Sequence, residues 1–192
     1  MKTLFGGVKI RPCPVCRRNI NKDHIKVTDM KLIKKAEYQN LKDEDIKKYG
    51  TKIAFLIQKT RQLLQDEENK IIIFSQWSSM LKLISNVLTE FNIKYLTSKG
   101  NISSIKANMN KFESNDIRVL LLNPDDCIIG NDLTIATHII MTDILMMTKG
   151  KAKVIEEQLL GYVQRIGENK EINMIKLVTS GTIEEEYYKK QR

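Results

Sequence analysis

The chain has 192 residues, of which 42% are hydrophobic and 29% charged, and its formal net charge is +9. This length and composition fit one ordinary domain with an appendage. No apolar run approaches the roughly 18 residues that span a bilayer, and the first ten residues contain no uninterrupted apolar stretch, so we expect neither a membrane span nor a signal peptide.

The N-terminal segment is strongly basic. Residues 1–36 hold ten Lys or Arg and only two acids, a net charge of +8. Basic segments attract phosphate backbones through counterion release, which makes DNA a candidate partner that this segment would bind weakly. A tail that only improves solubility is the alternative. Residues 37–50 are polar and mixed in charge, and we interpret them as a linker with room for a short helix.

Cys13 and Cys16 form a Cys-x-x-Cys pair, and Cys127 is the only other cysteine. This is not the disulfide framework of a secreted domain, so we expect a reducing, intracellular compartment. The spacing of the pair suits zinc, with His24 as a candidate third ligand. Because a structural zinc site needs four ligands, a pair that binds no metal is the alternative.

Hydrophobic spacing predicts the elements of residues 51–192. Apolar residues recur at helical intervals over 52–65, 80–91, 102–112, 152–164 and 182–190. Short runs that are apolar on both faces predict buried strands at 70–74, 93–96, 117–122, 138–141 and 172–178. Because strands and helices alternate, we predict an α/β domain over 51–192 in which helices flank a parallel sheet.

Four segments carry motifs in a recognisable order: Lys-Ile-Ile-Ile-Phe-Ser-Gln-Trp at 70–77, then residues 119–136, 157–168 and 177–185. They resemble motifs IV, V and VI and the C-terminal sequence of the C-terminal helicase lobe of Swi/Snf-type, superfamily-two ATPases. The resemblance implies a RecA-like sheet for residues 51–192. Cys13-Pro-Val-Cys16 resembles the last cysteine pair of a RING finger, which implies the RING-containing, SHPRH-like branch and a RING remnant within residues 1–36.

Motif VI implies the catalytic positions. Gln158, Gly161 and Arg165 stand in register with the family pattern, so the resemblance implies that Arg165 is an arginine finger for the transferred phosphoryl group. Tyr162 occupies the position of the family's first arginine, and a phenol supplies no positive charge. We therefore predict a degenerate motif, and a surface ion pair is the alternative role for Arg165.

Motifs IV and V imply residues that face nucleotide or DNA. These are Ser75 and Gln76, at a strand end where open α/β sheets bind ligands, together with Gly130, Thr134 and, from motif VI, Gly161.

Two glycines of the motif V pattern are Cys127 and Ile128 here, which restricts a backbone that must bend, so an inert loop is the alternative. We interpret Trp77 as a packing residue.

ATP hydrolysis also needs a phosphate-binding loop, and the chain contains no Gly-x-x-x-x-Gly-Lys-Ser/Thr sequence. The resemblance therefore implies ATP with Mg²⁺ only where a separate first lobe joins this one, and we expect the chain alone to be inactive. It further implies a place in the nucleus or at a viral replication site. A non-catalytic scaffold that binds a protein partner and a ubiquitin-ligase fragment are the alternatives.

Overall fold

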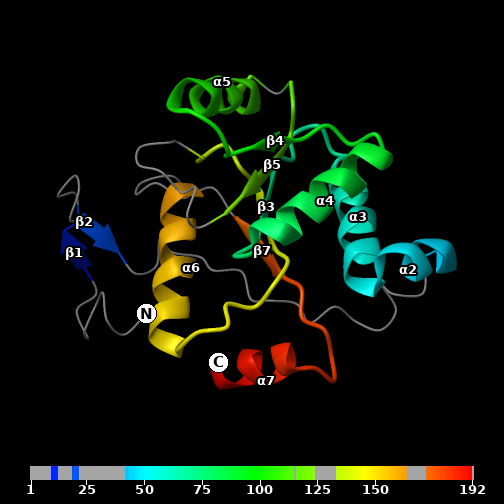
Figure 1. Cartoon of the computed structure of the whole chain (residues 1–192). Coiled ribbons are helices and arrows are strands. Elements are labelled where there is room, and N and C mark those ends of the chain that lie inside the picture. The colour runs from blue at the N-terminus through cyan, green and yellow to red at the C-terminus, as the bar shows by residue number, and fades with distance from the viewer. Residues whose placement is uncertain are drawn as a thin grey trace.

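The structure is a computed structural model whose central feature is a parallel sheet with helices on both faces (Figure 1). It describes residues 10–12, 19–21, 42–114, 116–123, 133–163 and 172–191. In the first two ranges, the strands β1 (Ile10–Pro12) and β2 (Asn19–Asn21) pair antiparallel.

The sheet has five strands in the order β4-β5-β3-β6-β7, and every neighbouring pair is parallel. Along the chain, the strands are β3 (Ile71–Phe74), β4 (Leu96–Thr97), β5 (Val119–Leu122), β6 (His138–Met141) and β7 (Asn173–Lys176). Phe74, the last residue of β3, pairs with the last residues of β5 and β6, so these three strands end at the same level.

The helices are α2 (Asp43–Tyr49), α3 (Thr51–Leu63), α4 (Ser78–Glu90), α5 (Ile102–Glu113), α6 (Lys149–Val163) and α7 (Ile183–Gln191). Helices α3 and α4 pack on one face of the sheet, and α5 and α6 pack on the other. Helix α2 lies in the predicted linker and is separated from α3 by Gly50, whose φ of 82° favours glycine. None of the helices among these residues is long and apolar enough to cross a membrane.

The two cores explain why the strands read as continuously apolar. Side chains alternate along a strand, so Ile71 and Ile73 of β3 pack toward α3 and α4, whereas Ile72 and Phe74 pack toward α5 and α6. All four are buried. Burying each such side chain contributes about 1.5–3 kcal/mol, so a polar residue at any of the four positions would be costly.

The predicted architecture is confirmed: helices flank one parallel sheet, and the elements follow in the predicted order. The strand expected at 93–96 is displaced, because β4 contains only Leu96 and Thr97. Ile93 is buried by the turn that follows α4, where its N–H donates to the carbonyl oxygen of Leu88 at 2.8 Å. The sequence suggested a strand at Ile93 because a residue buried in a turn is apolar, as a residue in a buried strand is.

Candidate functional site

Because β3, β5 and β6 end at the same level, three polar residues lie together at the carboxyl edge of the sheet. Ser75 follows β3, Asn123 follows β5 and Thr142 follows β6. All three are buried, at 0%, 1% and 0% exposure. A buried polar group is costly unless it is hydrogen-bonded, so their partners define the site.

The amide of Asn123 ties β5 to β3, because its Nδ2 donates to the carbonyl oxygen of Ser75 at 3.1 Å. The hydroxyl of Ser75 accepts the backbone N–H of Trp77 at 3.1 Å, which turns the chain outward into the start of α4. On the other side, the backbone N–H of Thr142 donates to the carbonyl oxygen of Phe74 at 2.9 Å. The loop after β3 is therefore held by both neighbouring strands.

Asp143 adds a buried carboxylate to the same edge, with a side chain only 4% exposed. One carboxylate oxygen accepts the backbone N–H of Gln76 at 3.1 Å, and the other accepts the hydroxyl of Thr142 at 2.9 Å. The Gln76 side chain continues the link, because its Nε2 donates to the carbonyl oxygen of Ile144 at 2.8 Å. The loops after β3 and β6 thus form one hydrogen-bonded unit.

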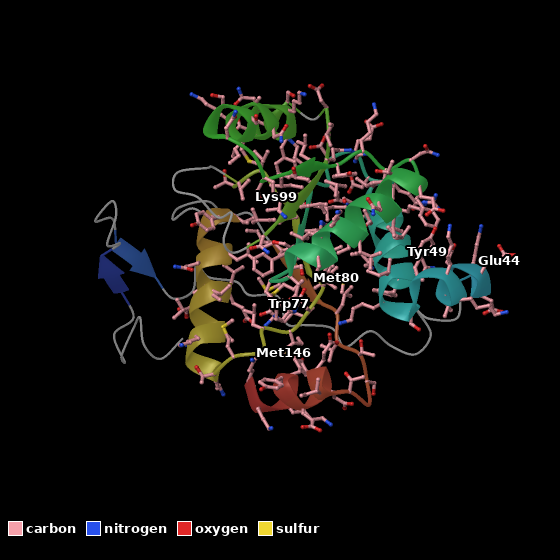
Figure 2. All side chains as sticks on the ribbon, in the orientation of Figure 1. Glu44, Tyr49, Trp77, Met80, Lys99 and Met146 are labelled. Atoms are coloured by element: carbon pink, nitrogen blue, oxygen red, sulfur yellow. The ribbon has the colours of Figure 1, made fainter. Side chains whose placement is uncertain are left out.

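Trp77 projects from this unit. Its side chain is 51% exposed, and Met146, in the loop that leads to α6, is 40% exposed. Figure 2 shows Trp77 near Met80 at the start of α4, and Met146 on the loop that leads to α6. The expectation that Trp77 is a packing residue is wrong, because Trp77 precedes the first turn of α4 and about half of it is exposed to solvent.

The remaining predicted site residues are spread over two elements. Gln158 and Gly161 are exposed on α6, and Thr134 is half-buried just before β6. The carbonyl oxygen of Tyr162, on the same helix, accepts the backbone N–H of Leu133 at 3.2 Å. The end of motif V and the helix of motif VI are therefore in contact, as a joint site requires.

Five predicted residues, Gly130, Arg165, Cys13, Cys16 and His24, lie outside the described residues. Within the described ranges, no group of three or more His, Cys, Asp or Glu side chains could hold a metal ion.

Sequence reasoning missed Asn123, Thr142 and Asp143. Their signal was present: each follows an apolar strand directly or by one residue, and the carboxyl ends of parallel strands meet at one edge. The contacts between the three loops could not be read from the sequence, because they depend on the strand order, in which β3 separates β5 from β6.

His138 is a titratable residue at the opposite, amino edge of the sheet. Burial lowers its pKa, and the nearby positive charge of Lys59 lowers it further, so the ring is neutral at pH 7. Its Nδ1 lies 2.9 Å from the hydroxyl of Thr137 at the amino end of β6. The neutral ring serves the packing of that end of the sheet and is remote from the polar carboxyl edge.

The domain that contains this sheet matches a known protein family. The model of the helicase conserved C-terminal domain matches residues 51–167, more than half of the chain. The chain belongs to this family. Its relatives are Swi/Snf-type, superfamily-two helicases, so the resemblance of the four motifs is confirmed.

Three relatives show the range of similarity. An uncharacterized ATP-dependent helicase of Schizosaccharomyces pombe is 34% identical over 140 residues, covering 71% of this chain and 13% of the relative. The DNA repair protein RAD5 of Cryptococcus neoformans is 26% identical and covers 96% and 17%. The E3 ubiquitin-protein ligase SHPRH of Mus musculus is 27% identical and covers 90% and 10%. The chain thus spans less than a fifth of the length of each.

Two solved structures share the fold. The C-terminal part of the Fun30 ATPase domain has a TM-score of 0.65 at 24% identity, over 82% of this chain and 49% of that chain. The Hef helicase domain of Pyrococcus furiosus has a TM-score of 0.56 at 20% identity, over 78% and 31%. The parallel sheet is therefore the RecA-like sheet of a helicase C-terminal lobe.

Proposed function

We propose that this helicase C-terminal domain is the second lobe of a Swi/Snf-like, DNA-dependent ATPase, and that it depends on a separate first lobe for ATP hydrolysis. The observation that carries the proposal is the prebuilt carboxyl edge, where the loops after β3, β5 and β6 are locked together by buried hydrogen bonds. Ligands of open parallel sheets bind at this edge.

In the proposed complex, the first lobe holds ATP with Mg²⁺, and this lobe closes over the phosphates. Arg165 would stabilise the negative charge that develops on the transferred phosphoryl group. Gln158 and Gly161 would line the same face of the lobe, with Gly130 and Thr134 from motif V and the Ser75–Gln76 turn from motif IV. ATP, once bound, supplies the phosphoryl group, and every contact named here serves to orient it or balance its charge.

Tyr162 is the reason to propose a degenerate lobe. It stands where the family places its first arginine, near the end of α6, and its partly buried side chain packs against the core under that helix. Replacing an arginine finger by a group without charge lowers turnover on the order of 10³-fold. The assembled pair of lobes would therefore hydrolyse ATP more slowly than a family member that keeps both arginines, and Arg165 would supply the charge that remains.

DNA is the proposed nucleic-acid partner, bound weakly through residues 1–36, whose net charge is +8. The similarity to the DNA repair protein RAD5 of Cryptococcus neoformans supports this choice. Work on DNA would place the protein in the nucleus or at a viral replication site. Zinc at Cys13, Cys16 and His24 is a proposal that rests on their spacing alone.

The test of the ATPase proposal is a mixing experiment. The chain alone should hydrolyse no ATP above background, with or without DNA. Adding the first lobe of a RAD5-type relative as a separate polypeptide should give DNA-dependent turnover, and Arg165→Ala should abolish it. Lys106→Ala, on the exposed side of α5, is the matched control and should leave turnover unchanged. Turnover by the chain alone that disappears in Arg165→Ala would refute the dependence on a first lobe.

A second candidate function is a non-catalytic scaffold that binds a protein, or a ubiquitin-ligase fragment that does so through the RING remnant. The observation that favours a scaffold is the exposed apolar pair Trp77 and Met146 at the carboxyl edge. Under this alternative, the mixture hydrolyses no ATP, while Trp77→Ala weakens binding of a purified partner.

A further inference from the structure

The loop between β3 and α4 places the side chains of Ser75, Gln76 and Trp77 in different environments. The Ser75 hydroxyl accepts the Trp77 N–H, and the Gln76 amide donates to Ile144, so both polar side chains are bonded within the chain. Trp77 alone of the three turns its side chain to solvent, with 51% exposed. The contact surface that this loop offers is therefore the indole.

We propose that Asp143 is a positioning residue: its buried carboxylate holds the backbone N–H of Gln76 and thereby fixes Trp77 as the outward contact residue of the carboxyl edge. The bond at 3.1 Å restrains the Ser75–Gln76 peptide unit, one residue before Trp77, and the Ser75 hydroxyl in that unit accepts the Trp77 N–H at 3.1 Å, so the restraint passes from Asp143 through this unit to Trp77. The relevance of this edge to ATP hydrolysis rests on the proposed function, whereas the positioning itself is a property of the lobe.

The choice of an acid supports this role. Removing a carboxylate from water is costly, and a hydrophobic residue of similar size is often as stable or more so at such a position. Asp143 is 4% exposed, yet each of its oxygens accepts one hydrogen bond, from Gln76 and from Thr142. An aliphatic residue would leave the Gln76 N–H without this acceptor, so a side-chain oxygen at this buried position is explained by the loop that it holds.

The chain contains a single tryptophan, so intrinsic fluorescence reports on Trp77 directly. Asp143→Ala should release the loop, lower the steady-state anisotropy of Trp77 and raise the Stern–Volmer constant for acrylamide. The rise should reach at most about twofold, because 51% of the side chain is already exposed. Asp143→Asn should restore both values, since an amide oxygen can accept from Gln76 while its NH₂ donates to the Thr142 hydroxyl.

Two matched variants separate positioning from a general loss of stability. Thr142→Val removes a buried hydroxyl beside Asp143 but leaves the Gln76 bond in place, and Gln76→Ala keeps the backbone N–H that Asp143 accepts. Both should preserve the anisotropy and quenching of Trp77, measured under conditions where urea titration shows each variant to be folded. An unchanged Trp77 in Asp143→Ala, or an equal change in Thr142→Val, overturns the proposal.

If Asp143→Ala does not fold, Asp143→Ser gives the same test, because its hydroxyl is too short to reach Gln76 and should release Trp77 in the same way. A folded Asp143→Ser with an unchanged Trp77 would overturn the proposal. Adding the separate first lobe then connects the loop to function: Asp143→Ala should lower ATP turnover and Asp143→Asn should keep it. If the unsubstituted mixture is inactive, the proposed ATPase function fails, while the fluorescence measurements still decide the role of Asp143.

Discussion

Lys70 donates a hydrogen bond from its Nζ to the carbonyl oxygen of Phe112 at 2.7 Å, joining the residue before β3 to the last turn of α5. The same Nζ donates to the carbonyl oxygen of Glu113 at 2.9 Å. The last carbonyl groups of a helix have no partner within the helix, and a cation is favoured there by the helix dipole. The buried side chain of Lys70 thus caps the C-terminal end of α5 and anchors this helix to the sheet.

We predict that Lys70→Met lowers the free energy of unfolding by about 2 kcal/mol, because two carbonyl oxygens lose a charged donor. Urea denaturation followed by circular dichroism measures the loss. Lys106→Met, on the exposed side of α5, is the control and should change stability by less than about 0.5 kcal/mol. Equal losses in the two variants would show that the contacts of Lys70 contribute nothing specific.

Thr60 should be a site where a polar group destabilises the fold. Its side chain is 0% exposed on α3, and its hydroxyl has no hydrogen-bond partner among the described residues. Thr60→Val replaces the hydroxyl by a methyl group of similar shape, so we expect a gain of about 1 kcal/mol in the free energy of unfolding. Thr60→Ser keeps the hydroxyl and loses a methyl group, and it should be less stable than the parent. A loss of stability in Thr60→Val would mean that the hydroxyl has a partner.

Glu185 should make the first turn of α7 sensitive to acid. Its carboxylate accepts the backbone N–H of Gly181 at 2.8 Å and pairs with Lys189, and these contacts lower its pKa from 4.5 to about 2. A carboxyl group with a lowered pKa stabilises the folded chain above its unfolded pKa near 4.5, and this contribution disappears as the pH falls toward 2.

The measurement is the difference in unfolding free energy between the parent chain and Glu185→Gln as a function of pH. We expect the parent to be more stable at pH 6 and the two curves to converge as the pH falls from 4.5 toward 2. Glu186→Gln removes one charge from the same helical turn and is the control for a general charge effect. Parallel curves for the parent and Glu185→Gln would contradict the assigned cause.

Residues 1–36 should carry most of the DNA affinity, since they hold a net charge of +8 out of +9 for the whole chain. Deleting them should abolish most binding to duplex DNA at low salt and flatten the salt dependence, which steepens by about 0.9 for each phosphate neutralised. Fluorescence anisotropy of labelled DNA at several salt concentrations measures both. Replacing Lys106 and Lys111 of α5 by Gln in the full chain is the control. Equal affinity with and without residues 1–36 would move the contacts to the RecA-like lobe.

The sequence by itself determined the fold class. The runs at 71–74, 119–122 and 138–141 are apolar at every position but His138, and such runs alternating with helices are typical of a parallel sheet covered on both faces. The four motifs determined the family, because their order and spacing survive even where Tyr162 replaces a motif residue. Helical periodicity located the helices to within three residues at either end.

Only the tertiary structure decided which polar residues work together. Gln76 and Asp143 are 67 residues apart, and their bond exists because β6 lies next to β3 and ends at the same level. Trp77, which the sequence led us to expect as a packing residue, is exposed at the same edge. Local sequence determines whether a segment forms a helix or a strand. Which residues meet at the end of a strand depends on the strand order, and the strand order is selected by the free energy of the whole sheet.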